Sequence, residues 1–242
     1  MDITDIILLL FVGAGASFVQ RVSGFGLAIF AMLFLPHFLS SPIAAASISN
    51  MFSCATSSYN SIKYRKNISF IIVLPMLISA LITIPFAVYL SNHITVKSFT
   101  AVLGIVLIIL SLYFIIFGNK VKFKPTKFKG VISGIGSGLL NGLFSTGGPP
   151  VVIYLNNVAE NKKIYFACMQ FFFAVTNIYA VAFRFLNGFI TSQVIIYLLI
   201  GLIGCFVGDY IGKKIFNKLD GDKIKSIVYI AMLSSGILMI IK

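Results

Sequence analysis

Long apolar stretches separated by short basic loops dominate the hydrophobic pattern of the chain. Residues 68–90 and 98–117, for example, each run for at least 18 residues without a charge. About 20 such residues let a helix cross the roughly 30 Å hydrocarbon layer of a bilayer. Because several such stretches are present, the pattern predicts an all-α, polytopic membrane helix bundle.

Residues 3–36 and 129–158 depart from this pattern, because each is too long for one simple span and too short for two. Both are apolar yet contain closely spaced glycines, and the second includes FSTGGPPVVIYL at residues 144–155. An unpaired peptide group is costly in hydrocarbon, so broken backbone at membrane depth must face protein or a wet cavity. We predict that each stretch forms a broken or re-entrant helical hairpin.

The distribution of Lys and Arg among the loops favours hairpins that return to their own side, which leaves three full spans in each half. This arrangement places 15 basic residues on the cytoplasmic side and leaves Lys97, Arg184 and Lys242 outside. If each hairpin stretch crossed the membrane once instead, 10 basic residues would lie inside and 8 outside. The first arrangement agrees better with the excess of Lys and Arg in cytoplasmic loops. An odd number of crossings per half inverts the second half, as in many secondary transporters.

The two halves of the chain also resemble each other in sequence. At an offset of 121 residues, without gaps, similar residues coincide: Gly13 with Gly134, Gly15 with Gly136, Gly26 with Gly147, and Gln20 with Asn141. The match indicates an internal duplication. We therefore predict one membrane domain made of two inverted repeats, residues 1–121 and 122–242. Close helix packing is an alternative explanation for some of the glycines, namely Gly13, Gly15, Gly134, Gly136 and Gly138.

Composition excludes a soluble protein and argues against several functional classes. Hydrophobic residues make up 59% of the chain, charged residues only 10%, and the mean hydropathy is +1.02. The net charge of +13 comes from the loops, so we expect no nucleic-acid partner. The start of the chain, with Asp2 and Asp5, does not resemble a cleavable signal peptide. Three separate cysteines, two histidines and few acids form no metal, redox or hydrolase motif, so we expect no cofactor and no enzyme.

The GGPP sequence suits the start of a helix inside the membrane. Pro149 and Pro150 lack N–H donors and fit a first helical turn, with Ser145 or Thr146 as the cap before it. This predicts the end of one short helix, a glycine turn and the start of another. The free N–H groups and aligned peptide dipoles at such a start favour an anion, and the glycines let it approach the backbone.

The first half repeats the break at residues 20–26, without prolines and with a charge. Arg21 lies some 18 residues into the first apolar stretch, and an ionised residue at that depth is a functional candidate. Its guanidinium can form a two-pronged pair with a carboxylate, sulfite or sulfonate. The alternative is that a short first helix lets Arg21 extend to the membrane interface.

The helices that follow each break carry polar residues every seven positions, which places them on one helix face. These residues are Ser49, Thr56 and Lys63 and, 121 positions later, Gln170, Asn177 and Arg184. In the first half the polar face is widened by Asn50, Ser53, Ser57 and Asn60. The face either bonds helices to one another or lines a substrate path. In both cases we expect it to lie in the bundle interior.

Two segments resemble the glycine-rich turns of the TauE/SafE family of sulfite-exporter-like anion transporters: GFGLAIFAMLFLP (24–36) and NGLFSTGGPPVVIYL (141–155). The first departs from the family pattern at Leu27, where a further glycine is often found. The resemblance implies transport of small sulfur-containing or carboxylate anions across a bacterial plasma (inner) membrane.

These observations together predict a secondary transporter, and more specifically an exporter, of small anions such as sulfite, sulfonates or small carboxylates. An anion channel is the alternative, and a membrane-embedded enzyme is a weaker one. The expected partners are the small anion and the lipid bilayer, and a homo-oligomer is left open. The coupling ion is also left open, since Asp209 is the sole acid close to a span interior. The candidate substrate-binding residues, with none catalytic or metal-binding, are Gln20, Arg21, Ser23, Gly24, Phe25, Gly26, Asn50, Asn141, Ser145, Thr146, Gly147, Gly148, Pro149, Gln170 and Asn177.

Overall fold

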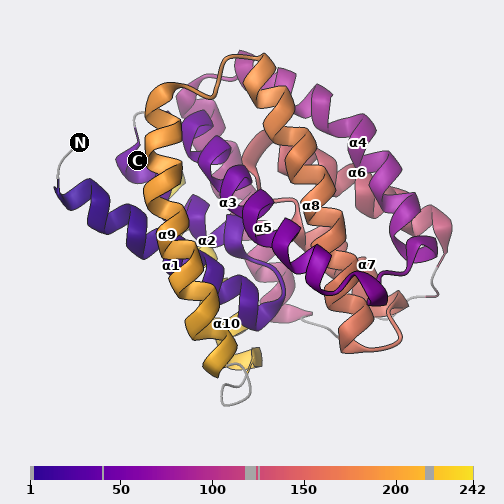
Figure 1. The fold of residues 1–242 in the computed structure, drawn as a ribbon. Coiled ribbons are helices and arrows are strands. Elements are labelled where there is room, and N and C mark those ends of the chain that lie inside the picture. The colour runs from indigo at the N-terminus through magenta and orange to yellow at the C-terminus, as the bar shows by residue number, and fades with distance from the viewer. Residues whose placement is uncertain (1–2, 40, 118–123, 125, 216–220, 242) are drawn as a thin grey trace.

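The computed structural model describes residues 3–39, 41–117, 124, 126–215 and 221–241. These residues form ten α-helices, one short 3-10 turn at Arg65–Asn67, and no strand (Figure 1). The predicted loop charges at Lys120, Lys122, Lys218 and Lys242 fall outside the described residues. The helices are α1 (Ile3–Ser23), α2 (Leu27–Phe38), α3 (Pro42–Lys63), α4 (Phe70–His93), α5 (Val96–Ile116), α6 (Lys127–Phe144), α7 (Gly148–Val158), α8 (Lys162–Leu186), α9 (Ser192–Ile215) and α10 (Gly221–Ile241).

The helices follow one another twice in the order long, short, long, long, long. The short helix has 12 residues in the first set (α2) and 11 in the second (α7). Helix α2 begins at Leu27 and α7 at Gly148, and every other helix of the second set starts within four residues of the same displacement along the chain. The duplication of the sequence thus has a parallel in the succession of helices.

The main helix pairs each join one member of the first set to one of the second. Helix α1 packs along α9, α4 along α6, α3 along α8, and α5 along α10. The pair α1 and α9 and the pair α4 and α6 lie on opposite sides of the bundle, with α3 and α8 between them (Figure 1). One continuous hydrophobic core includes residues from both sets. The two halves are therefore interleaved rather than stacked as separate bodies.

The predicted close-packing glycines differ in what surrounds them. A Cβ on three of them would strike a backbone carbonyl oxygen of the neighbouring helix: Gly13, Gly134 and Gly138. These glycines let α1 approach α9, and α6 approach α4, more closely than side chains would allow. Gly15 instead lies against the ring of Phe30, and a Cβ on Gly136 would lie at an ordinary 3.5 Å from Pro150.

The outer surface is apolar, as expected for a membrane protein. Ile82 on α4 is 71% exposed and Phe206 on α9 is 66% exposed. Five of the described helices are long and apolar enough to cross a bilayer, namely α1, α4, α5, α8 and α9. Helix α3, predicted as a simple span, is not among them, because much of its buried face consists of Ser and Asn. It lies against α8, where neighbouring helices shield its polar groups.

The arms of the two predicted hairpins are unequal. Helix α1 has 21 residues and α6 has 18, which at 1.5 Å per residue gives about 32 and 27 Å. Helices α2 and α7, with 12 and 11 residues, reach only about 18 and 17 Å. The expectation of a short helix before each break is therefore wrong. The first arm is nearly as long as a full span, and only the second arm is short.

Candidate functional site

Both predicted breaks interrupt the helices, but the first is shorter than the predicted residues 20–26, since α1 continues to Ser23. In the first, Gly24 and Gly26 have φ of 85° and 99°, a left-handed conformation that glycine adopts without strain. In the second, Ser145 ends α6 with φ of 63° and is the sole non-glycine residue in the described part of the chain with positive φ. Each break thus reverses the chain within three residues, between the ends of α1 and α6 and the starts of α2 and α7.

The second break confirms the predicted position of the prolines but not the predicted cap. Pro149 and Pro150 lie in the first turn of α7. The N-cap is Gly147, which makes no side-chain cap bond. Ser145 is instead the C-cap of α6, and its hydroxyl donates to Ser49 Oγ of α3 at 3.1 Å. Thr146 Oγ1 is buried and has no hydrogen-bond partner.

A small cavity lies between the two breaks. Its volume is about 20 Å³, counted as the space open to the centre of a water molecule, which is room for about one water. Nine of the fifteen predicted site residues line it: Gln20, Phe25, Gly26, Asn141, Ser145, Thr146, Gly147, Gly148 and Asn177. The other six do not line it: Arg21, Ser23, Gly24, Asn50, Pro149 and Gln170.

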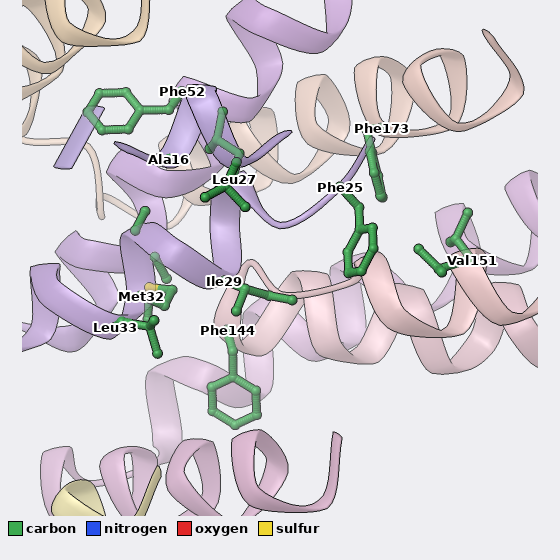
Figure 2. Packing of buried hydrophobic residues seen from close by; sticks show 14 of the residues in the cluster. Ala16, Phe25, Leu27, Ile29, Met32, Leu33, Phe52, Phe144, Val151 and Phe173 are labelled. Atoms are coloured by element: carbon green, nitrogen blue, oxygen red, sulfur yellow. The ribbon is translucent and has the colours of Figure 1, made fainter. Parts of the chain in front are cut away.

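Aromatic rings close part of the cavity wall. A Cβ on Gly148 would lie 3.5 Å from Phe25 and 3.6 Å from Phe173. Figure 2 shows these two rings next to each other beside α7, which carries Val151. Phe173 was not predicted as a site residue, because nothing in the sequence distinguishes it from the neighbouring phenylalanines of α8. Between these rings, the backbone of Gly148 at the start of α7 forms the cavity wall.

Helix α2 directs its first turn at the same cavity. Leu27, Ala28 and Ile29 line it. The first backbone hydrogen bond of this helix runs from Phe30 N–H to Gly26 O at 2.8 Å. The N–H groups of residues 27–29 therefore have no acceptor within the helix. Since α7 begins at the cavity as well, two helix N-termini with partial positive charge meet there. Such an arrangement favours an anion over a cation.

Amide side chains hold the first break in place. Gln20 Nε2 donates to Ser57 Oγ and to Gln170 Oε1, both at 3.0 Å. Gln170 Nε2 donates in turn to the carbonyl oxygen of Gly24 at 2.9 Å. Within the break, the Ser23 hydroxyl donates to Val19 O at 2.7 Å and also contacts Phe25 O. The Gly24 carbonyl thus finds its partner on α8, and the Gln20 side chain connects the end of α1 to α3 and α8.

The second break is held at the corresponding place. Displacing the Gly24–Gln170 contact by the repeat offset of 121 residues gives the pair Ser145–Ser49, which is the hydrogen bond observed between α6 and α3. The residue types differ, but in each case the helix after one break supports the other break. The polar faces of α3 and α8 therefore confirm the first alternative left open by the sequence, hydrogen bonding between helices. They bond helices together, and through Ser53 and Asn177 they line the cavity.

Arg21 forms the predicted two-pronged pair, but with a carboxylate of its own chain. Its Nε donates to Asp209 Oδ1 at 2.7 Å and its Nη2 donates to Asp209 Oδ2 at 2.6 Å. Arg21 is 7% exposed and the Asp209 side chain 22%, so extension of Arg21 to the interface does not describe its position. The sequence marks Asp209 as the one acid near a span interior but does not indicate its partner, because 188 positions separate it from Arg21.

The structure corrects the predicted position of Arg184 relative to the membrane. It was counted among the basic residues outside the membrane, yet its side chain is fully buried, at 0% exposure. Its Nε donates to Asn50 Oδ1 at 2.8 Å and its Nη2 to the carbonyl oxygen of Gly142 at 2.7 Å. Asn50 Nδ2 donates to Asn141 Oδ1 and Asn177 Oδ1, at 2.9 and 2.7 Å. The position of Arg184 on the polar face of α8 was the signal that it points inward.

Comparison with known proteins supports the resemblance seen in the sequence. Neither the curated proteins nor the solved structures contain a match to the chain. The profile of the family described as "Sulfite exporter TauE/SafE" matches residues 9–239, a range that includes both breaks, the cavity and all five helices suited to crossing a bilayer apart from the first turns of α1. The chain therefore belongs to the TauE/SafE sulfite exporter family of membrane transport proteins.

Proposed function

We propose that the protein is a secondary transporter, built from two inverted repeats, that exports small anions such as sulfite, sulfonates or small carboxylates across a bacterial plasma membrane. The observation that carries the proposal is the cavity between the two breaks. Thr146 lines it with a fully buried hydroxyl that has no partner among the described residues. A buried donor without a partner is costly, and an anion in the cavity would accept its hydrogen bond.

The surroundings of the cavity suit an anion in three further respects. The start of α2 supplies N–H groups, and the start of α7 supplies that of Gly148, because Pro149 and Pro150 have none. Gly148, where a Cβ would meet no atom closer than 3.5 Å, allows close approach to the backbone, and asparagine at 141 supplies an amide. Among the described residues no carboxylate lines the cavity. An anion would therefore meet donors and partial positive charge without repulsion from an acid.

The size of the cavity favours a carrier mechanism over a channel mechanism. A volume of about 20 Å³ holds about one water, and sulfite is several times larger. Binding therefore requires the two breaks to move apart, which a fixed selectivity filter does not need. The interleaved pairs α1–α9 and α4–α6 offer two bodies that could rock about α3 and α8, as inverted repeats do in alternating access. The inside-negative potential, worth about 2.3 kcal/mol per charge per 100 mV, would drive export.

A second cavity supplies an approach path on the side predicted to lie outside. Its volume is about 310 Å³ by the same measure, and it lies between the starts of α3 and α9. Ser41, Thr191 and Gln193 contribute polar groups to its wall. Phe189, which also lines it, donates its backbone N–H to Arg184 O at 3.0 Å. Arg184 therefore lies between this outer cavity and the central one.

Flux measurements in proteoliposomes test the proposal. Efflux of labelled sulfite, a sulfonate and a small carboxylate is compared for the wild type and Gly148→Leu, whose side chain starts beside Phe25 and fills the central cavity. The matched control is Gly136→Leu, in the same hairpin but outside the cavity. We expect Gly148→Leu to abolish flux of the transported anion and Gly136→Leu to retain it.

Two outcomes would contradict the proposal. If no anion moves through the wild type, the protein is not the proposed transporter. If Gly148→Leu transports as well as Gly136→Leu, the cavity is not the binding site. Counterflow separates the two transport modes, since unlabelled anion on one side accelerates uptake of labelled anion only through a carrier.

A further inference from the structure

We infer that Arg184 gives the central cavity its preference for anions, and that it acts through Asn50 by fixing the direction of the hydrogen bonds that reach the cavity wall. We call the hydrogen-bonded series Arg184–Asn50–Asn141 the relay. The inference rests on the proposed function, because it assigns the selectivity of the same site. Arg184 is a positioning residue in this scheme, since it does not line the cavity itself.

Arg184 is a buried cation without a carboxylate partner in the described part of the chain. Arg21 and Arg184 are the two basic side chains buried there. Asp209 neutralises Arg21. Arg184 Nη1 is buried and makes no hydrogen bond. The interior around the cavity therefore carries one positive charge that no described acid balances.

The chemistry of the guanidinium dictates the direction of the relay. A guanidinium only donates, so the Asn50 atom at 2.8 Å from Arg184 Nε must be its oxygen. The Asn50 amide nitrogen must then donate, and it does so to the side-chain oxygens of Asn141 and Asn177. Both of these asparagines are thereby left with their amide nitrogens as the groups available to other partners.

The two asparagines use those nitrogens differently. Asn177 Nδ2 donates to Ser53 Oγ at 3.0 Å and to Phe173 O at 2.7 Å, so it is committed within the protein. Asn141 lines the cavity, and no described group accepts a hydrogen bond from its Nδ2. The relay therefore presents an N–H donor at the cavity wall and excludes the opposite orientation, in which the amide oxygen would face a ligand. A donor backed by an uncompensated cation selects anions over cations and over neutral molecules of the same shape.

The variant Asn50→Asp tests the direction of the relay while keeping its shape. A carboxylate only accepts, so it pairs with Arg184 and makes Asn141 turn its nitrogen toward it, while Asn177 keeps its bonds to Ser53 and Phe173. The Asn141 oxygen then faces the cavity, and the positive charge is cancelled. Because Arg184 gains an ion pair, the fold should be retained. The alternative is that Arg184 is purely structural and only caps the end of α6 through Gly142 O. This alternative predicts no loss of anion binding in Asn50→Asp.

Sulfite binding is measured as the rise in unfolding temperature of the purified full-length protein with increasing sodium sulfite. We expect a dose-dependent rise for the wild type and for Lys97→Gln, which removes an exposed positive charge. For Asn50→Asp we expect at least tenfold weaker apparent affinity with an unfolding temperature, without sulfite, no lower than that of the wild type. Asn141→Asp provides a second variant, because it keeps the bond from Asn50 but replaces the donor at the cavity by a carboxylate oxygen. It should lose sulfite binding in the same way.

Each outcome of these binding and flux measurements either supports or overturns the role of the relay. If Asn50→Asp binds sulfite with wild-type affinity, the role of the relay is overturned but the proposed transport function stands. If Asn50→Asp does not fold, wild-type affinity in Asn141→Asp has the same meaning. A wild type that is not stabilised by sulfite, sulfonate or carboxylate also overturns the inference. A wild type that binds sulfite in this relay-dependent manner but shows no flux supports the inference and removes the proposed function.

Discussion

Thr146 offers the sharpest test of the site, because substituting it should change binding and stability in opposite directions. Its hydroxyl is fully buried, lines the central cavity and has no partner among the described residues. Thr146→Val exchanges the hydroxyl for a methyl group of similar shape. A buried polar group without a hydrogen bond costs about 1–3 kcal/mol, so we expect the variant to be about 1–2 kcal/mol more stable than the wild type.

The effect on transport follows from the lost hydrogen bond to the anion. Bonds to charged groups are worth about 1.5–3 kcal/mol, and each 1.4 kcal/mol is about tenfold in affinity. Thr146→Val should therefore raise the KM for sulfite flux by about 10- to 100-fold. The assay pairs proteoliposome flux at varied sulfite concentration with chemical unfolding in detergent. Both measurements use the same preparation, so that a folding defect cannot pass for a binding defect.

Thr176→Val serves as the matched control. Thr176 is equally buried, at 1% exposure, but its hydroxyl donates to Phe172 O at 2.8 Å and does not line the cavity. We expect this variant to lose about 1 kcal/mol of stability and to keep the wild-type KM. An unchanged KM in Thr146→Val, or a loss of stability similar to that of Thr176→Val, would refute the assignment of the Thr146 hydroxyl to the substrate.

Two further predictions concern the packing around the site. Gly134→Ala should lower the unfolding free energy by about 1–2 kcal/mol, since its Cβ strikes Met76 O and overpacking outweighs the gain in helix propensity. Gly136→Ala, which has room, should raise it by about 1 kcal/mol; equal stabilities would contradict the α4–α6 contact. Asp209→Asn should cost about 2–3 kcal/mol, less than for a fully buried pair because Asp209 is partly exposed. Adding Arg21→Gln should then cost little more, and a double-mutant cycle showing additive losses would argue against the pair.

The sequence by itself determined where the helices run and where they break. Hydropathy predicts spans because an unpaired peptide group in lipid is costly at every position, independent of the rest of the fold. Glycines and prolines predict interruptions within residues 20–26 and 144–150, of which residues 24–26 and 145–147 are non-helical, and they place Pro149 and Pro150 in a first helical turn. The heptad spacing of Gln170, Asn177 and Arg184 predicts one polar face, because helix geometry fixes which residues share a face.

Only the tertiary structure decided which groups meet across the bundle. Arg21 and Asp209 are 188 positions apart, and Arg184 and Asn50 are 134 apart. Local patterns show that such residues face inward, but the partner depends on how α1 packs along α9 and α3 along α8. For the same reason the cap predicted at Ser145 was wrong, since α3 supplies Ser49 as its partner. Periodicity assigns a residue to a face, whereas the free energy of a buried charge depends on the helix opposite, which the chain brings close only on folding.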